Sequence, residues 1–346
     1  MIEEQSDVGI WYTPAPFEQR RGCEKGSRRK NPAVRQVHPR AMLRPFLLLL
    51  FTFMRRALIG IAVIFGFHFT LHAQEIRRTP LVLAKGGTPE NPAVFEGKGM
   101  IIDLGIDITD RDWIKEANLW TSHGPLPDYP PVADTQRAGL FIDEVPLRIV
   151  RDRAAEARSG DKDKVIYVSP ESLKPGEMAW AADGSLHFRW PVGKAPGSAR
   201  VIHPPKGLAS CVVIACSHLI VRNIIAKHAA NDGFNIHGHR IGIRLENVKA
   251  FSNGDEGISA HETVQMDVVD SEIAWNGSAA GGVADVNDSV TSYTNCELHH
   301  NVNAAFLFDG KSHRVINCLI HHQEKDIVVR GADVVVEKLG VDWRRE

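Results

Sequence analysis

The sequence has almost no net charge, which excludes one broad class of partner. Its 346 residues carry 41 Lys plus Arg against 42 Asp plus Glu, for a formal net charge of -1. The basic residues are concentrated near the start, and residues 74–346 hold 30 basic and 37 acidic side chains. Binding to nucleic acid depends on a basic stripe that neutralises phosphates. The mildly acidic body therefore predicts no nucleic-acid partner, whereas a locally basic groove would still accept an anionic polysaccharide.

Cysteine is scarce too, with five residues in the whole chain. None of their spacings is that of zinc ligands, which excludes a zinc-binding module of the usual kinds. Cys23 lies in the basic start of the chain, and Cys211 with Cys216 is one candidate disulfide pair.

The first 73 residues have the composition of a leader. Residues 1–53 are rich in Arg, Pro and Gly and show no apolar period. That indicates a disordered segment or a start assigned too far upstream. Residues 54–73 combine a basic start, a short apolar run and a small residue before the expected cut, the pattern of a signal peptide. The alternative is a single membrane anchor over residues 46–71, a stretch long enough to span a bilayer. The signal peptide predicts a secreted or periplasmic protein.

Residues 211–346 repeat themselves with a period of about 24. A polar corner recurs at Asn223, Asn247, Ser271, Asn295 and Asn317. A second polar corner recurs at Asn231, Asn253, Asn276, Asn301 and Gln323. Between the corners the apolar residues alternate, which indicates strands and excludes the helices of leucine-rich repeats. A period in the twenties with short strands and Asn corners predicts a right-handed parallel β-helix, an all-β solenoid.

The period converts sequence into stacked columns, because residues one coil apart lie about 4.8 Å apart. One inward column is expected at Val221, Leu245, Val269 and Tyr293. A second is expected at Ile236, Ala260, Ala284 and Phe308. Cys296 and Cys318 fall in one column of adjacent coils, where either a disulfide or two packed free thiols would fit.

Residues 74–210 are expected to hold an N-terminal cap, the first coils and an inserted β-subdomain. Residues 110–120 have the pattern of a helix, capped by Thr109 or Asp110. The segments LFIDEVPLRIVRD (residues 140–152) and PGEMAWAADGSLHFRWPVG (residues 175–193) precede the coils. This order resembles the pectin-lyase-like superfamily of secreted β-helix proteins, which includes glycoside hydrolases and polysaccharide lyases. The resemblance implies a small β-subdomain inserted near the N-terminal end, together with export.

One candidate catalytic site joins two acidic turns. Asp232 and Glu256 are 24 residues apart, and each precedes a stacked Gly, so their carboxyl groups are expected about 5 Å apart. Like charges at that distance raise one pKa and supply an acid and a base. The spacing suits a retaining glycosidase, and a wider gap through Asp255 would suit inversion. Asn231-Asp232 and Asp255-Glu256 are similar to acid motifs of polygalacturonases, although the later Gly-His-Gly and Arg-Ile-Lys motifs are missing. Turn chemistry is the alternative interpretation.

A second candidate site is an outward column at a step of 24. Its members are His237, His261, Asp285 and Asp309. Imidazole is the natural acid or base near neutral pH, so His237 and His261 are further catalytic candidates, and the same set suits a divalent cation. The residues expected to bind substrate around both sites are Asn231, Asn235, His239, Arg240, Glu262, Asp285 and Asp309. An extra residue in the segment 276–282 would slip the register and turn Asp285 into the core.

These features predict a secreted enzyme that cleaves glycosidic bonds of a polysaccharide or oligosaccharide. Hydrolysis is favoured over elimination, and Ca²⁺ is expected only for a lyase; no other cofactor and a monomer are expected. The alternative is a non-catalytic β-helix that binds glycan or acts as a cell-surface scaffold. His299-His300 and His321-His322, at a step of 22, are interpreted as structural stacking.

Overall fold

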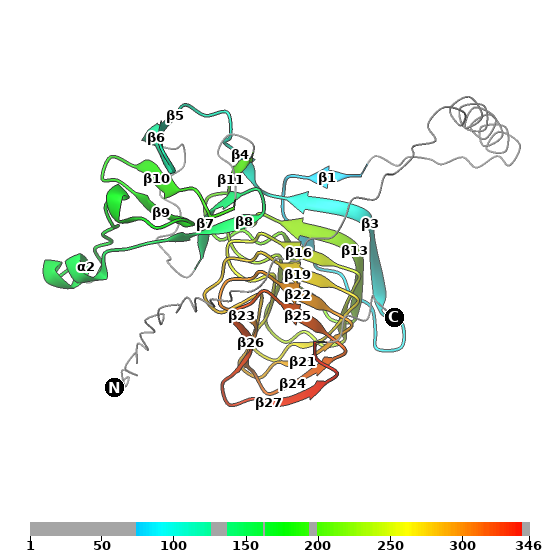
Figure 1. The fold of residues 1–346 in the computed structure, drawn as a ribbon. Coiled ribbons are helices and arrows are strands. Elements are labelled where there is room, and N and C mark those ends of the chain that lie inside the picture. The colour runs from blue at the N-terminus through cyan, green and yellow to red at the C-terminus, as the bar shows by residue number, and fades with distance from the viewer. Residues whose placement is uncertain (1–73, 126–136, 162, 194–198, 341–346) are drawn as a thin grey trace, which may run out of the picture. The chain divides into compact units, whose positions relative to one another are not determined.

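The computed structural model describes residues 74–125, 137–161, 163–193 and 199–340. All of them belong to the second of two compact units, His72–Glu346 (Figure 1). The expected leader, the signal peptide and the alternative membrane anchor lie outside the described residues. In the described ranges no helix is both long and apolar enough to cross a membrane.

The C-terminal part is a parallel β-helix, as predicted. One wall is a seven-stranded sheet in the order β2-β12-β14-β17-β20-β23-β26. Its strands are β2 (Leu81–Leu83), β12 (Val212–Ile214), β14 (Phe234–Ile236), β17 (Ile258–Ala260), β20 (Val283–Val286), β23 (Ala304–Asp309) and β26 (Lys325–Val329). Every pairing in this sheet is parallel.

The remaining walls belong to a 12-stranded sheet that bends at a corner. The long strand β13 (Leu219–Lys227) pairs with β15 through its first half and with β16 through its second. One ladder continues through β15 (Ile243–Glu246), β18 (Gln265–Val269), β21 (Val290–Thr294), β24 (Ser312–Ile316) and β27 (Asp333–Glu337). The other continues through β16 (Lys249–Phe251), β19 (Glu272–Ala274), β22 (Glu297–His299) and β25 (Leu319–His321). The strands β1 (Ile76–Arg77) and β3 (Ala93–Asp103) extend the sheet beyond β13.

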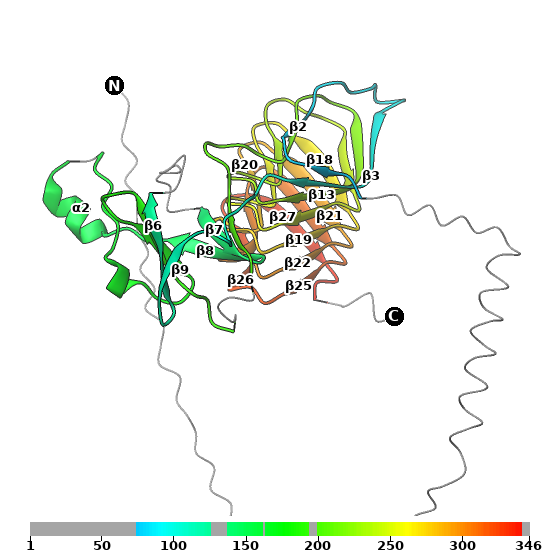
Figure 2. The ribbon, with the colours of Figure 1, turned by 90° about the horizontal axis from the view of Figure 1, so that it is seen from above.

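A separate eight-stranded sheet forms the inserted β-subdomain beside the solenoid (Figure 2). It contains β4 (Ile106–Asp107), β5 (Trp113–Glu116), β6 (Leu119–Pro125), β7 (Ala138–Ile142), β8 (Val145–Ile149), β9 (Glu177–Trp180), β10 (Ser185–Arg189) and β11 (Val201–His203). The short helix α2 (Arg153–Ser159) and the 3-10 turn η1 (Pro170–Ser172) follow β8. Trp113, Trp120, Phe188 and Trp190 pack together in a core of its own. The helix expected at residues 110–120 is wrong, because this segment forms the hairpin of β5 and β6, which buries Trp113 and Trp120.

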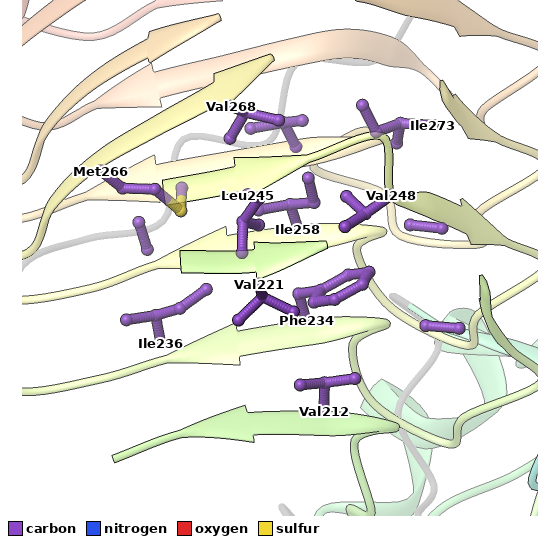
Figure 3. Close-up of a cluster of buried hydrophobic side chains, with 14 of the residues drawn as sticks. Val212, Val221, Phe234, Ile236, Leu245, Val248, Ile258, Met266, Val268 and Ile273 are labelled. Atoms are coloured by element: carbon purple, nitrogen blue, oxygen red, sulfur yellow. The ribbon is translucent and has the colours of Figure 1, made fainter. Parts of the chain in front are cut away.

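The solenoid is filled by stacked apolar columns, and two of the expected columns need correction. Val221, Leu245 and Val268 stack inward (Figure 3), so Val268 replaces the expected Val269. Along the seven-stranded sheet Ala260 pairs with Asp285, so Asp285 replaces Ala284 as the inward residue. The coil length varies from 21 to 25 residues along the solenoid, and a fixed step of 24 misassigns both positions.

Both polar corners are present, each with one changed member: Asp270 in the first, and Ala229 in the second, where its N–H donates to Asn253 Oδ1 at 3.2 Å in the place expected for Asn231. Left-handed backbone recurs at Asn223, Asn247, Asp270, Asn295 and Asn317. Asp270 thus takes the place expected for Ser271, and its Oδ1 accepts a 3.0 Å hydrogen bond from Asn295 Nδ2. The second corner is a buried ladder in which Asn253 Nδ2 donates to Asn276 Oδ1 and Asn276 Nδ2 donates to Asn301 Oδ1, each at 2.9 Å.

The cysteines of the described residues are free thiols and form neither of the candidate disulfides. Cys211, Cys216, Cys296 and Cys318 are all free. Cys296 and Cys318 are buried in the apolar core of adjacent coils, where they pack as small hydrophobic side chains.

Candidate active site

The acidic turns before β14 and β17 are stacked one coil apart. Gly233 N donates to Glu256 O at 3.0 Å, which places Asp232 beside Glu256. The coils leave no space for a side chain between these turns. A Cβ added to Gly233 would lie 2.6 Å from Gly257 O, and one added to Gly257 would lie 2.6 Å from Ile273 Cγ2. The two glycines therefore hold the preceding carboxylates in register.

Three carboxyl groups meet at this corner. One oxygen from each of Asp232, Asp255 and Glu256 lies within 4.8 Å of the others. The three residues are buried, with 2% of Asp232, 9% of Asp255 and 8% of Glu256 exposed. Solvent therefore reaches the cluster from the side of Asp255 and Glu256.

Neighbouring amides and a hydroxyl orient two of the carboxyl groups. Asn235 Nδ2 donates to Asp232 Oδ2 at 2.6 Å, and Asn231 Nδ2 donates to the same oxygen at 2.9 Å. Ser278 Oγ donates to Glu256 Oε1 at 2.6 Å. Asn231 and Asn235, expected to bind substrate, thus act on Asp232 within the protein.

Burial and mutual repulsion keep a proton in this cluster near neutral pH. Burial, followed by the charge of Asp255, raises the pKa of Asp232 to about 6. Burial, followed by the charges of Asp232 and Asp255, raises the pKa of Glu256 well above its usual value. Glu256 therefore retains its proton to a higher pH than a free glutamate does. The pair titrates as a unit and supplies both an acid and a carboxylate.

Arg137, from the start of the subdomain strand β7, completes the cluster. Its Nε lies 2.8 Å from Asp255 Oδ2. The next residue, Ala138, donates its backbone N–H to Gly254 O at 2.7 Å, which fixes the strand against the acidic turn. No sequence signal points to Arg137, because it comes from another sheet and more than a hundred residues upstream. Ser278 could have been predicted from the sequence period, since it lies one coil beyond Asp255.

The outward histidines form a second group at the other end of the same strands. The rings of His237 and His261 stack with centroids 4.0 Å apart. His237 Nδ1 lies 3.4 Å from Glu262 Oε2, and His261 Nε2 lies 2.7 Å from Ser259 Oγ. Burial, followed by the neighbouring His237, lowers the pKa of His261. This ring is therefore neutral at physiological pH.

The exposed turn that follows β14 carries two more of the expected residues. His239 Nδ1 lies 2.9 Å from Thr263 Oγ1 on the next coil. Arg240 Nη1 donates to the carbonyl of His239 at 3.2 Å. Both side chains are at the surface, beside the stacked histidines in the sequence.

Asp285 does not belong to this outward column, which corrects the prediction. The 25-residue coil between β17 and β20 places Val286 beside His261, and Asp309 pairs with Val286. Asp285 is fully buried in the solenoid and accepts hydrogen bonds from Thr291 Oγ1 at 2.6 Å and Tyr293 Oη at 3.0 Å. Burial raises its pKa to about 7. Asp285 is a core residue and takes no part in substrate binding.

The acid cluster and the stacked histidines are two separate groups. Five residues separate Asp232 from His237, at most roughly 16 Å of chain at about 3.3 Å per residue, and the strand β14 lies between them. The prediction treated them as neighbours on one face. The structure places them at the two ends of β14 and β17, so no single bond of a substrate contacts both.

A calcium ion fits the acid cluster poorly. Carboxylate oxygens are suitable ligands for Ca²⁺. Here, however, Arg137 already neutralises Asp255, and Asp232 shares a proton with Glu256. The arrangement favours proton transfer over the binding of a divalent cation.

Two shallow depressions lie elsewhere, on the ladder that contains β15, β18 and β21. One has a volume of about 330 Å³ and is lined by Arg222, Asn223, Arg244, Glu246, Asn247, Val269 and Asp270. The other, of about 350 Å³, is lined mainly by polar residues of β18, β21 and β24, including Asp267, Ser292 and Arg314. Neither depression is lined by the acid cluster or by the stacked histidines.

Comparison with known proteins adds little to this geometry. No family model and no curated protein matches the chain. A solved structure titled "Glycoside hydrolase" aligns with 74% of this chain and 70% of its own, at a TM-score of 0.47 and 12% identity. Another, "The complex structure of XylC with xylose", aligns with 76% of this chain and 58% of its own, at 0.36 and 10% identity. Neither likeness assigns a reaction to this chain, and membership of the pectin-lyase-like superfamily stays a prediction.

Proposed function

We propose that this protein is a carbohydrate-active enzyme that cleaves glycosidic bonds by acid–base catalysis at Asp232, Asp255 and Glu256. The observation that carries the proposal is the buried cluster of three carboxyl groups within 4.8 Å of one another. Burial and mutual repulsion raise the pKa of Asp232 to about 6 and that of Glu256 well above its usual value. Glycosidases need one carboxylic acid that keeps its proton and one carboxylate that has lost it.

Glu256 is the proposed proton donor. It retains the proton, and 8% of it is exposed against 2% of Asp232. Protonation of the glycosidic oxygen by Glu256 would leave a negative charge on the cluster, which the Arg137 guanidinium stabilises through Asp255. One oxygen from each of Asp232, Asp255 and Glu256 lies within 4.8 Å of the others. That separation is near the roughly 5–5.5 Å of a retaining pair and narrower than the roughly 6.5–9.5 Å that gives an inverting enzyme room for its water. Asp232 is therefore proposed as the carboxylate partner of Glu256, and Asp255 as the neighbour whose charge raises the pKa of both.

Hydrolysis is favoured over elimination. A lyase must neutralise the carboxylate of a uronic acid, by Ca²⁺ or by a free arginine. The arginine at this cluster, Arg137, is engaged by Asp255 at 2.8 Å. The proton held on Glu256 suits the leaving-group oxygen of a hydrolase. A calcium requirement, or a product that absorbs in the ultraviolet, would assign the reaction to elimination.

A screen of purified full-length protein against plant and algal polysaccharides tests the proposal by release of reducing sugar. Asp232→Asn and Glu256→Gln should each lower the rate on any accepted substrate by about 100-fold or more, the usual contribution of general acid–base groups. The matched control is Glu116→Gln, which changes an exposed carboxylate of the inserted subdomain outside the cluster. Full activity in both cluster variants would refute the carboxylate mechanism.

A non-catalytic glycan-binding role is the second candidate. The limited exposure of the acid cluster favours it, and so do the shallow polar depressions lined by Arg222, Arg244 and Arg314. In that case no polysaccharide in the panel is cut. Substitution of these arginines would weaken glycan binding, whereas substitution of Glu256 would not.

We also propose export of the protein from the cytoplasm, on the pattern of residues 54–73 alone. Sequencing the N-terminus of the mature protein tests it. A start just after residue 73 is expected, and a chain that keeps residues 54–73 would contradict it.

A further inference from the structure

Four histidines gather where β22 and β25 end, away from the acid cluster. His299 and His321 are paired neighbours of adjacent coils, and each is followed by another histidine. The rings of His299 and His321 stack with centroids 4.9 Å apart and an interplanar angle of 7°. The rings of His300 and His322 stack at 4.5 Å and 9°. The sequence spacing suggested structural stacking alone.

Two glutamates fix the tautomers of the inner rings. His299 Nε2 lies 3.1 Å from Glu272 Oε1, and His321 Nε2 lies 2.9 Å from Glu297 Oε1. A carboxylate at this distance from a ring nitrogen accepts its N–H proton in a hydrogen bond. The proton of each inner ring is therefore assigned to Nε2, and its Nδ1 carries a lone pair that can accept a hydrogen bond or bind a metal ion.

These lone pairs face the two outer rings. His299 Nδ1 lies 2.9 Å from His300 Nδ1, and His321 Nδ1 lies 2.7 Å from His322 Nδ1. Ring nitrogens of His300, His321 and His322 all lie within 4.8 Å of one another. In each close Nδ1 pair the outer ring carries the hydrogen-bonding proton, which an entering metal ion would displace.

Left-handed backbone turns the outer rings to this position. His300 and His322 have φ angles of 56° and 53°, in the corner column that holds Trp275 one coil earlier. Trp275 stacks on His300 at 4.1 Å and closes one side of the group. His322 is exposed, and His300 and His321 are partly exposed, so an ion can enter from solvent.

We propose that His299, His300, His321 and His322 form a binding site for a divalent transition-metal ion of the Zn²⁺ class. Imidazole nitrogen is a preferred ligand of Zn²⁺, Cu²⁺ and Ni²⁺. Histidine ligands that donate their other ring proton to a carboxylate are the usual arrangement around such ions, and Glu272 and Glu297 supply it here. Ligands of a tetrahedral zinc lie about 3.4 Å apart, from Zn–N distances of about 2.0–2.1 Å. Each Nδ1 pair would open by roughly half an ångström to admit the ion.

The site would clip the last coils of the solenoid together. Its ligands come from two successive coils, and the strand β25 on the outer one is only partly buried. A bound ion adds a cross-link at this end and stabilises the folded state. The inference is independent of the proposed carbohydrate cleavage.

Titration calorimetry with ZnCl₂ tests the site, using full-length protein without a polyhistidine tag. One Zn²⁺ per chain should bind to the wild type at this site, with a zinc-dependent rise in Tm. The double variant His300→Ala/His322→Ala should lose that binding event and the rise in Tm. Glu272→Gln should weaken the affinity for Zn²⁺ by about 10-fold or more, although all four rings remain. His237→Ala is the matched control, because it alters the other group of stacked histidines and should leave the event unchanged.

Visible absorption of the Co²⁺ complex gives a second readout that does not depend on stability. Tetrahedral coordination by imidazole produces intense d–d bands, which should appear in the wild type and in His237→Ala but not in the double variant. Circular dichroism without metal establishes that each variant is folded. Wild-type protein that binds Zn²⁺ no tighter than the folded double variant would overturn the proposal and leave structural stacking as the role of these histidines.

Discussion

Asp232, Glu256 and Asp285 are buried carboxyl groups with raised pKa values, yet their surroundings give them different roles. Asp232 and Glu256 lie at a corner of the solenoid next to a third carboxylate and Arg137. Asp285 lies in the core, where its polar neighbours are the hydroxyl groups of Thr291 and Tyr293, the Ala260 backbone and the His313 ring. A raised pKa by itself therefore does not mark a catalytic group; the presence of a second acid and partial access to solvent do.

Asp285→Asn should stabilise the protein at high pH. The folded-state pKa of Asp285, about 7, lies above the unfolded value of about 3.9, so the folded state binds the proton more tightly. The wild type therefore loses stability as pH rises from about 4 to 7, and the full cost is present above 7. The substitution removes this cost. The free energy of unfolding should therefore rise by about 2–4 kcal/mol at pH 8 and change little at pH 4. Urea unfolding at both pH values measures the difference, and an equal effect at both would contradict a buried, protonated Asp285.

Asp232→Asn should also change the pH dependence of the residual activity. The charge of Asp232 is one cause of the raised pKa of Glu256, second to burial. Its removal lowers the pKa of Glu256, so the proton donor is lost at a lower pH. The alkaline limb of the rate profile should move to lower pH compared with the wild type. An unmoved limb in a variant with measurable activity would mean that Glu256 is not the titrating acid.

At the scale of elements, the two Asn ladders differ in burial and so in their contribution to stability. Asn276 accepts hydrogen bonds from Asn253 N and Nδ2 and donates to Ala250 O and Asn301 Oδ1. All of these groups are buried. The outer ladder at Asn223 and Asn247 is exposed, and water can replace its hydrogen bonds.

Asn276→Ala should therefore destabilise the protein by about 2–4 kcal/mol, because buried partners are left unsatisfied. Asn247→Ala is the matched control and should cost about 1 kcal/mol, mainly for the left-handed backbone. Urea unfolding curves give both values. Equal losses would show that the buried ladder contributes no more than the exposed one.

The period of the sequence predicted the solenoid because stacking is a local property repeated many times. It failed at Val269, Ala284 and Asp285 because single coils of 23 and 25 residues shift the register, and alternation then exchanges inside and outside. The helix expected at residues 110–120 failed for a different reason. There the tertiary packing of Trp113 and Trp120 in a hairpin outweighed the local helical pattern.

At the scale of the whole molecule, the inserted subdomain docks on the corner that carries the acid cluster. Lys227 Nζ lies 2.5 Å from Glu144 Oε1, and Ser252 Oγ donates to Glu144 Oε2 at 2.7 Å. Arg137 reaches Asp255 beside these contacts. Periodicity located the acids within the solenoid, but it could not reveal a partner contributed by a different sheet.

Arg137→Met should destabilise the protein by about 3 kcal/mol, because it removes the ion pair of a mostly buried Asp255 carboxylate. The double variant Arg137→Met/Asp255→Asn should recover most of this loss, since no charge then remains without its ion pair. Thermal and urea unfolding of the three proteins measure the coupling between the sites. If the free energy lost in the double variant equals the sum of the losses in Arg137→Met and Asp255→Asn, the ion pair does not anchor the subdomain.

The rate of glycosidic cleavage by Glu256→Gln, relative to wild type, tests the central claim most directly. The comparison is made on whichever polysaccharide the wild type degrades, with Asp285→Asn as a buried-carboxyl control. The account predicts a loss of about 100-fold or more for Glu256→Gln and an unchanged rate for the control. Wild-type activity in a folded Glu256→Gln variant, or no cleavage of any polysaccharide by the wild type, would contradict it.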